Sequence, residues 1–358
     1  MNKVDIVIVN YKVPEFLSQC LESIRAALRN VCGKVIVVDN ASNDGALPIL
    51  KTTFPEVTFI ENHENVGFSR ANNQGIRAGN APFVLLLNPD TIIGESTLTQ
   101  CIEEMERTPD CGAIGVRMLN AHGEFLKESK RGSISPFSCA CKFSGLSSLF
   151  PASPILNRYY LGCLPEDEPH NVNFLAGAFM FMRRKALEEV DLLDERFFMY
   201  GEDLDLCQKM RNRGYVCRYL PIPIIHYKGE SESADANPQR YADAFYGAMK
   251  LFYSKYHPRK NIFDRLILRL ISRKKTMAQK NTKKTPPKTN IRYHIDLETT
   301  IFLPKEVPSE SHIIVTPREG LYDRLLMLML SLQGRGTTLI TYNPEKDIYI
   351  GPGGRIRC

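Results

Sequence analysis

Several acidic residues in this sequence stand directly after runs of apolar residues, where a buried strand would end. Asp39 follows the apolar run 35–38, and Asp90 closes the sequence Leu-Asn-Pro-Asp after the run 83–87. Asp203 stands in the acidic sequence Glu-Asp-Leu-Asp, which enters a predicted helix. A carboxylate at such a place can bind a nucleotide base, hold a hard divalent cation or take a proton from a hydroxyl. Each also has an ordinary interpretation as a turn or helix-capping residue.

The turn after Asp39 is rich in groups that form hydrogen bonds, because it reads Asp-Asn-Ala-Ser-Asn-Asp-Gly. We expect Asp39 to accept the imide N–H of a pyrimidine base, and a turn without ligand contacts is the alternative. The end of the first apolar run supplies further polar groups near this turn. The candidates for contact with the nucleotide, besides Asp39, are Asn10, Tyr11, Asn40, Ser42 and Asp44.

A second polar segment, 65–75, combines a glycine turn with the start of a predicted helix that carries Arg70. A guanidinium fork suits phosphate oxygens, and the N–H groups of a helix N-terminus favour the same ligand. Arg70 is therefore a candidate for binding a diphosphate, with a capped surface helix as the alternative. His226 ends another apolar run, next to Lys228 and Gly229, and is either a structural hydrogen-bonding residue or a ligand contact.

A parallel sheet would position these residues. Continuous apolar runs indicate strands that are buried on both faces, and helical spacing between them indicates a doubly wound α/β fold. Ligands of such folds bind at the carboxyl ends of the strands, so Asn10, Asp39 and Asp90 should converge on one crevice. The predicted strands are 5–9, 35–38, 57–60 and 83–87, and the predicted helices are 14–28 and 69–78.

The second half of the sequence is less regular. Residues 132–170 are rich in Ser, Pro, Gly and aromatic residues, which predicts a long loop or a lid over an acceptor groove. The apolar stretch 173–182 predicts a strand, followed by a short helix from Lys185. Near the C-terminus, strand-like runs surround an apolar helix at 321–332 and predict a small α/β unit in which we find no chemical motif.

Composition and charge limit the function classes. The 358 residues are 43% hydrophobic and 24% charged, and no apolar stretch approaches the roughly 20 residues of a membrane-spanning helix. The net charge is +6, but residues 259–290 hold eleven Lys or Arg against one Asp. The apolar stripe within 262–271 makes this segment resemble a helix on anionic lipid, followed by a flexible linker at 276–290. We therefore expect an anionic membrane surface as partner and no nucleic acid.

Taken together, and in their order along the chain, five motifs resemble those of the inverting family 2 glycosyltransferases of the GT-A fold. The resemblance is greatest to rhamnosyltransferase-like members that build bacterial surface polysaccharides. The resemblance covers about residues 4–256 and depends on five motifs. They are Val-Ile-Val-Asn-Tyr at 7–11, Val-Val-Asp-Asn-Ala-Ser at 37–42, Asn-Val-Gly-Phe-Ser-Arg-Ala-Asn-Asn at 65–73, Leu-Asn-Pro-Asp at 87–90 and Tyr-Gly-Glu-Asp-Leu-Asp-Leu at 200–206.

The resemblance implies a role for each motif. Asp39 would bind the base, Asp90 would fill the last position of the family's D-x-D motif for Mg²⁺ or Mn²⁺, and Asp203 would deprotonate the acceptor. His226 would then be a second metal or diphosphate contact. Asn88 replaces the first Asp of the metal motif, which leaves the preferred ion open, and would contact the sugar or ribose instead. Asn73 would belong to the same nucleotide-binding set as Arg70.

The resemblance also implies a nucleotide-sugar donor and a glycan or lipid-linked acceptor. An imide contact at Asp39 favours a dTDP- or UDP-sugar, and attachment through the basic segment would place the crevice at the cytoplasmic face of the membrane. We expect a GT-A domain at 1–256, a basic amphipathic helix and linker at 257–290, and a small α/β appendage at 291–358. Two alternatives remain at this stage. Paired carboxylates also serve glycoside hydrolases, and a non-catalytic module could bind membrane or RNA through the basic segment.

Overall fold

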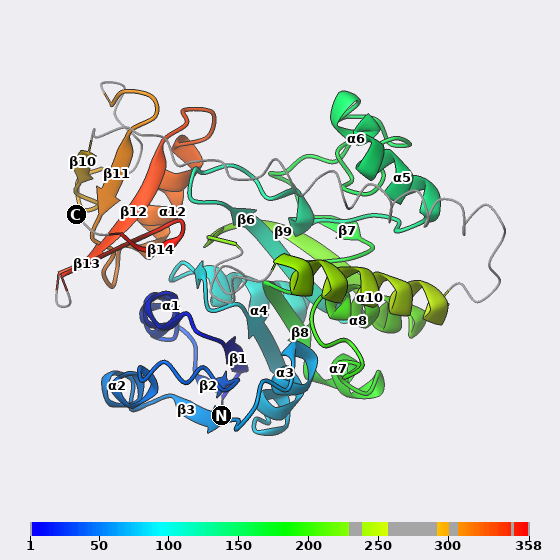
Figure 1. Ribbon diagram of the computed structural model, residues 1–358, viewed down its shortest axis with the longest axis horizontal. Coiled ribbons are helices and arrows are strands. Elements are labelled where there is room, and N and C mark those ends of the chain that lie inside the picture. The colour runs from blue at the N-terminus through cyan, green and yellow to red at the C-terminus, as the bar shows by residue number, and fades with distance from the viewer. Residues whose placement is uncertain (1, 229–237, 257–291, 301–306, 345–346, 357–358) are drawn as a thin grey trace.

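The computed structural model describes residues 2–228, 238–256, 292–300, 307–344 and 347–356. It contains a nine-stranded main sheet and a separate five-stranded sheet formed by the C-terminal part of the chain (Figure 1). This confirms an α/β fold with a small second unit. The predicted basic helix and linker at 257–290 lie outside the described residues. No helix in the described part of the chain is long and apolar enough to cross a membrane.

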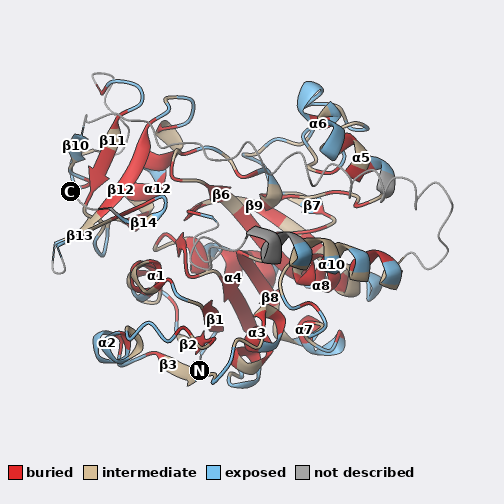
Figure 2. Cartoon of the chain, viewed as in Figure 1, coloured by how far each residue is buried: buried red, intermediate tan, exposed pale blue. Residues whose placement is uncertain are grey.

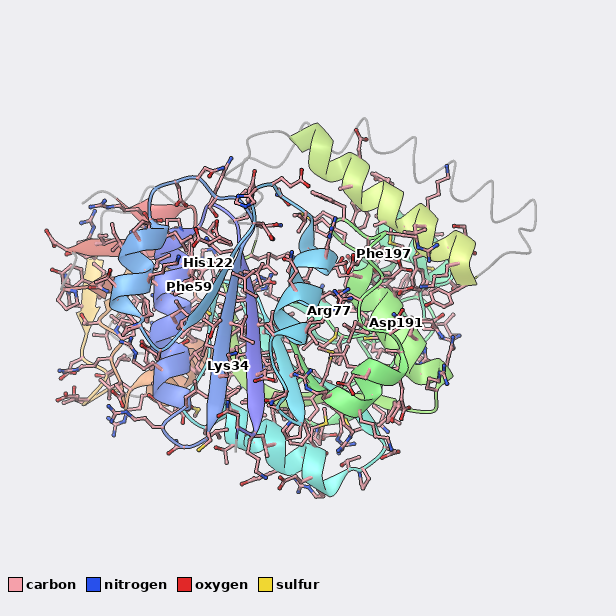
Figure 3. All side chains as sticks on the ribbon, turned by 90° about the horizontal axis from the view of Figure 1, so that it is seen from below. Lys34, Phe59, Arg77, His122, Asp191 and Phe197 are labelled. Carbon is pink, nitrogen blue, oxygen red and sulfur yellow. The ribbon has the colours of Figure 1, made fainter. Side chains whose placement is uncertain are left out.

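The first half of the main sheet is parallel and has the order β3-β2-β1-β4, as the apolar runs predicted. Asn10 pairs with Asp39 at the carboxyl ends of adjacent strands. Seen from below, Lys34 on β2, Phe59 on β3 and Arg77 on α3 mark this half of the sheet and the helix beside it (Figure 3). The elements are β1 (Val4–Asn10), α1 (Pro14–Ala27), β2 (Gly33–Asp39), α2 (Leu47–Thr53), β3 (Thr58–Glu61), α3 (Phe68–Arg77) and β4 (Phe83–Leu87).

The second half of the main sheet is mixed. Strand β8 lies antiparallel between β4 and β6, whereas β6 and β9 are parallel, so the strands of both halves mostly run in one direction. Thr91 pairs with His226 where β5 meets the end of β9. The elements are β5 (Thr91–Ile92), α4 (Thr97–Arg107), β6 (Cys111–Leu119), β7 (His170–Val172), β8 (Phe179–Arg183), α7 (Arg184–Glu189), α8 (Glu202–Asn212), β9 (Val216–His226) and α10 (Pro238–Tyr256).

Two predictions for the second half need correction. The predicted strand at 173–182 begins only at Phe179, because the preceding residues are bonded to Arg131 and Asp203 rather than to a neighbouring strand. The predicted loop at 132–170 contains two helices, α5 (Pro136–Ser144) and α6 (Leu146–Leu149), and a short 3₁₀ helix, η1 (Lys127–Ser129), precedes it. A capping box between Ser135 and Ser138 starts α5, and Gly145 ends it with φ of 88°.

The core lies on both faces of the main sheet, as the continuous apolar runs predicted. Ile6 and Ile8 of β1 pack with α1 and α4 on one face, and Val7 packs with α3 on the other. The strands are buried between layers of helices whose outer faces are exposed (Figure 2). The strand ends that carry the candidate residues are therefore held by a rigid, fully packed scaffold.

The C-terminal unit packs directly on the main domain. Phe16, Ile92 and Ile225 share one buried apolar cluster with Leu325 and Met329 of the unit. The carboxylate of Glu95 accepts hydrogen bonds from the first N–H groups of α12, which belong to Tyr322 and Asp323. The elements are β10 (Arg292–Ile295), β11 (His312–Val315), α12 (Tyr322–Ser331), β12 (Thr338–Asn343), β13 (Ile348–Gly351) and β14 (Gly354–Ile356).

Candidate functional site

A cavity of about 360 Å³ lies at the edge of the main sheet where β1, β4 and β9 end. Its wall includes the strand ends, the start of α3, the region around η1 and α5, the start of α8 and residues of α10. It therefore collects side chains that are more than 100 residues apart in sequence. The lining includes Tyr11, Asn40, Asn88, Asp90, Glu128, Arg131, Lys142, Tyr159, Tyr160, Gly177, Glu202, Asp203, His226 and Lys228.

Asp90 and His226 form a buried pair on one side of this cavity. Nε2 of His226 lies 3.4 Å from Oδ1 of Asp90 and 3.5 Å from Nδ2 of Asn88. The backbone holds this geometry, because Thr91 pairs with His226 and the N–H of Tyr227 donates to the carbonyl of Asp90 over 3.0 Å. Burial opposes ionisation of Asp90, but the charge and hydrogen bond of His226 outweigh it, so the pKa of Asp90 is lowered.

Asp90, Asn88 and His226 offer some, but not all, of the ligands that a divalent cation needs. They offer a carboxylate, an amide oxygen and an imidazole, and Nδ1 of His226 is buried without a hydrogen-bond partner among the described residues. The described residues contain no group of three or more His, Cys, Asp or Glu that could hold a metal ion alone. Mg²⁺ commonly uses one or two protein carboxylates and takes further ligands from substrate phosphates and water. The donor set therefore suits a cation that arrives with a diphosphate.

Asp203 lies on the other side of the cavity, at the first turn of α8. Its Oδ2 accepts hydrogen bonds from Nη2 of Arg131 at 2.5 Å and from the N–H of Gly177 at 3.2 Å. Its Oδ1 accepts from the N–H of Leu204 at 2.8 Å. Burial opposes the charged form of Arg131, but the carboxylate of Asp203 outweighs burial and raises the pKa of Arg131. The two residues therefore form a largely buried ion pair.

Glu202 precedes Asp203 but lies in a different environment. It is buried, and its Oε2 has no hydrogen-bond partner within the part of the chain that the structure describes. Burial first, and then the charge of Asp203, raise the pKa of Glu202 to about 8. A raised pKa keeps the carboxyl group of Glu202 protonated at neutral pH. This uncharged group lies next in sequence to Asp203, whose carboxylate pairs with Arg131. A buried acid with a strongly raised pKa is typical of catalytic sites.

The sequence analysis missed the cationic and aromatic wall of the cavity. Nζ of Lys142 lies 3.9 Å from the ring centre of Tyr159 and 5.0 Å from that of Tyr160. Burial, and then the charge of Arg131, lower the pKa of Lys142 to about 8. Glu128 pairs with Lys228 across the same wall. Lys228 was named beside His226 from the sequence, but a lack of periodicity between residues 127 and 160 hid Glu128, Arg131, Lys142, Tyr159 and Tyr160, for which only the density of aromatic and basic types was a signal.

The predicted base-binding residues form a hydrogen-bonded cluster beside the cavity. Nδ2 of Asn10 donates to Oδ1 of Asp39 at 2.7 Å, and the hydroxyl of Ser42 donates to the same oxygen at 2.6 Å. Asn40 accepts from the N–H of Val66 at 3.0 Å and so connects the turn to the segment before α3. Of the predicted set, Tyr11 and Asn40 line the cavity, whereas Asn10, Asp39 and Ser42 do not.

Three other predicted residues lie away from the cavity lining. The side chain of Arg70 is 59% exposed and lies 4.0 Å from Glu195. Asn73 is buried, and its amide exchanges hydrogen bonds with the backbone of Leu193. Asp44 is exposed and accepts from the N–H of Ala46, which is a turn interaction. The structure thus brings Asp203, Asp90, His226 and Asn88 together, but does not bring Arg70, Asn73 or Asp44 to the same cavity.

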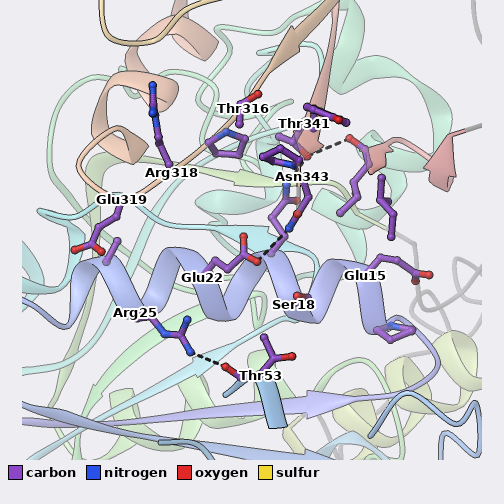
Figure 4. Close-up of a pocket in the computed structure, with 18 of the residues that line it drawn as sticks. Glu15, Ser18, Glu22, Arg25, Thr53, Thr316, Arg318, Glu319, Thr341 and Asn343 are labelled. Carbon is purple, nitrogen blue, oxygen red and sulfur yellow. Dashed lines mark hydrogen bonds between the residues drawn. The ribbon is translucent and has the colours of Figure 1, made fainter. Parts of the chain in front are cut away.

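A larger cavity of about 600 Å³ lies between α1, α2 and the C-terminal unit (Figure 4). Its polar side chains bond to one another or to nearby backbone. The side chain of Asn343 donates to Glu22 at 3.3 Å, and Arg25 donates to the carbonyl of Thr53 at 3.0 Å. None of the predicted site residues lines it. We therefore place the chemistry in the smaller cavity, where buried acids and cations face each other.

Comparison with known proteins agrees with the predicted family. Residues 5–191 match the family model described as Glycosyl transferase family 2. The N-acetylglucosaminyl-diphospho-decaprenol L-rhamnosyltransferase of Mycobacterium tuberculosis is 26% identical over 265 residues, which cover 70% of this chain and 84% of that protein. The low-salt glycan biosynthesis hexosyltransferase Agl10 of Haloferax volcanii is 27% identical over 215 residues, covering 59% of this chain and 62% of the relative.

A solved structure is similar at lower identity. The mannosyltransferase PcManGT from Pyrobaculum calidifontis, in complex with GDP-Man and Mn²⁺, is 15% identical, with a TM-score of 0.46 and coverage of 78% of this chain and 75% of that chain. The family model, in contrast, matches more than half of the present sequence. This chain therefore belongs to glycosyl transferase family 2, and transfers a sugar from a nucleotide sugar.

Proposed function

We propose that the protein transfers a sugar from a dTDP- or UDP-sugar to a hydroxyl of a glycan or lipid-linked acceptor, with inversion at the anomeric carbon. The proposed setting is bacterial surface polysaccharide synthesis at the inner face of the membrane. Family membership supports the transferase class over a glycoside hydrolase. The similarity to a rhamnosyltransferase whose name specifies a diphospho-decaprenol acceptor supports a hexosyl donor and a lipid-linked acceptor.

One observation carries the proposal. Asp203 of α8 lines the same cavity as Asp90 and His226, which come from the strand ends. A single inverting displacement needs a base on one side of the anomeric carbon and stabilisation of the leaving group on the other. The cavity offers a carboxylate on one wall and a carboxylate–imidazole pair suited to a cation on another.

In the proposed reaction Asp203 takes the proton of the acceptor hydroxyl. The acceptor oxygen then bonds to the anomeric carbon, while the bond from that carbon to the diphosphate oxygen breaks and its electron pair leaves with the nucleoside diphosphate. Arg131 and the N–H of Gly177 fix the orientation of the carboxylate. Glu202 stays neutral at pH 7, so a second negative charge does not oppose the approach of the donor.

Asp90 and His226, with Asn88, would hold a divalent cation. Such an ion, Mg²⁺ or Mn²⁺, offsets negative charge on the diphosphate when it is bound. Lys142 and Lys228 of the same cavity add positive charge from the protein itself. Asp39 remains our candidate for binding the base of the nucleotide. Tyr11 and Asn40 are the residues of the predicted base-binding set that line the cavity.

A donor screen tests the proposed function. The purified protein is incubated with dTDP-, UDP- and GDP-sugars, with Mg²⁺ or Mn²⁺ present, and with a polyprenyl-diphosphate-linked sugar as acceptor. We expect a thymidine or uridine donor to be used, and NMR of the product to show inverted anomeric configuration. Retained configuration would contradict the single displacement. Cleavage of a model glycoside without nucleotide or metal would favour a hydrolase.

A further inference from the structure

Helices α5 and α6 carry an unusual concentration of exposed apolar side chains. Nine large hydrophobic residues are exposed in the described part of the chain, and six of them fall within residues 137–155. Isolated exposed apolar residues are ordinary, whereas a contiguous group marks an interaction surface. We call this group the α5–α6 patch; its members are Phe137, Phe143, Leu146, Leu149, Phe150 and Ile155.

The exposure belongs to a folded, amphipathic segment. The capping box and the left-handed Gly145 define the ends of α5, while Ser138, Cys139 and Cys141 on its other face are buried. Leu149 and Ile155 are 74% and 65% exposed, more than most of the other members. Both helices lie at the periphery of the molecule, and α6 presents a mostly exposed surface (Figure 2). The apolar side chains thus point away from a core that is already packed.

The charge of the segment suits an anionic surface. No Asp or Glu occurs between residues 129 and 165, so the patch itself carries no carboxylate that would repel anionic headgroups. On either side of the patch in sequence, the first exposed charged residues are Lys127 and Arg158, and the first exposed acids, Glu124 and Asp167, lie farther away. Apolar side chains flanked by cations are typical of helices that insert shallowly into the headgroup region of a bilayer. A surface that binds a protein partner, in contrast, has no general need to lack Asp and Glu.

The patch adjoins the cavity. Lys142 of α5 lines the cavity, and the next residue, Phe143, belongs to the patch. We propose that the α5–α6 patch docks on the surface of an anionic lipid bilayer, with the cavity opening beside it. This contact is separate from the basic segment 259–290 and does not depend on the identity of the donor or of the catalytic base.

Vesicle binding of matched variants tests the proposal. The full-length protein is sedimented with phosphatidylcholine vesicles that contain or lack phosphatidylglycerol. The patch variant is Leu149→Ser with Ile155→Ser. The control is Ile49→Ser with Met327→Ser, which removes two exposed apolar side chains outside the patch. Both variants keep residues 259–290, so attraction through that segment is equal in the two.

We expect the patch variant to partition into phosphatidylglycerol-containing vesicles about tenfold more weakly than the parent, because two apolar side chains no longer insert. The control should partition like the parent, and all three proteins should have the same melting temperature and nucleotide affinity. Equal partitioning of the patch variant and the control would overturn the proposal. Loss of self-association in the patch variant, with vesicle binding unchanged, would also overturn it and assign the patch to a second copy of the chain.

Discussion

Nη2 of Arg131 lies 2.5 Å from Oδ2 of Asp203, although 72 residues separate the two in sequence. Arg131 follows η1, whereas Asp203 belongs to the first turn of α8, so the ion pair joins two walls of the cavity. Side-chain exposures of 11% and 12% show that water screens the pair only weakly. The proposed base is thus held in a defined orientation before any acceptor enters.

A double-mutant cycle should show that Arg131 and Asp203 are energetically coupled. Arg131→Gln should lower the free energy of unfolding by about 3 kcal/mol, because it leaves a buried carboxylate without its partner. Asp203→Asn leaves an unpaired guanidinium, and the double variant should be less destabilised than the sum of the two, by about 1–3 kcal/mol. Urea denaturation measures all three. Strict additivity would mean that the pair contributes no coupling.

The pKa of Glu202 predicts a pH dependence of stability. Burial and the charge of Asp203 raise that pKa from 4.5 to about 8 in the folded protein. Between these values the folded protein holds a proton that the unfolded chain has lost, so the free energy of unfolding falls as pH rises through this window.

The variant Glu202→Gln removes this titration. From about pH 5 to about pH 8.5 it should lose less stability than the parent, by on the order of 4 kcal/mol. Chemical denaturation at both pH values measures the difference. Identical pH profiles for variant and parent would show that Glu202 is already ionised in the folded protein.

Metal binding should depend on Asp90 and His226. Asp90→Asn and His226→Gln should each weaken Mn²⁺ binding in the presence of UDP by about tenfold or more, because each removes one donor of a small set. Asn88→Asp should strengthen it, since a second carboxylate replaces an amide. Isothermal titration calorimetry measures the affinities, with the exposed Asp110→Asn as control. An unchanged Mn²⁺ affinity in Asp90→Asn would show that Asp90 is not a ligand of the metal.

The C-terminal unit should contribute to the stability of the main domain. Leu326 is 2% exposed in the shared apolar cluster, whereas its neighbour Met327 is 40% exposed. Leu326→Ala should lower the free energy of unfolding by about 2–4 kcal/mol, and Met327→Ala by about 0.5 kcal/mol or less. Because the cluster includes Ile92 and Ile225, next to the strand pairing of Thr91 and His226, nucleotide affinity should fall only in Leu326→Ala. Equal effects of the two variants would contradict a shared core.

Sequence patterns predicted the parallel half of the sheet because its strands are buried on both faces. The runs 6–9 and 83–87 then contain only apolar residues, and they lie in β1 and β4. The polar residues at those ends include Asp90, which the fold carries to the cavity lining as expected. Parallel strands place their carboxyl ends at one edge, so neighbouring strand ends meet without any knowledge of loops.

The rest of the site could not be predicted because it depends on helix faces and on contacts distant in sequence. Arg70 and Asn73 share α3, but only the packed structure shows that Asn73 points to Leu193 and Arg70 to solvent. Arg131 and Lys142 lie in a segment without periodicity, and their importance follows from contacts with Asp203 and Tyr159. The antiparallel strand β8 was also indistinguishable from a parallel one by its apolar pattern.

The most direct test of the account is the turnover of Asp203→Asn with the preferred donor and acceptor. The change is isosteric and removes both the ability to take a proton and the ion pair with Arg131, so we predict turnover about 10²-fold lower or more, with nucleotide affinity retained. Asp205→Asn is the control, because Asp205 is buried on the same helix but pairs with Lys255 at 2.7 Å and lies outside the cavity lining. Near-normal turnover in Asp203→Asn would contradict the assignment of Asp203 as the catalytic base.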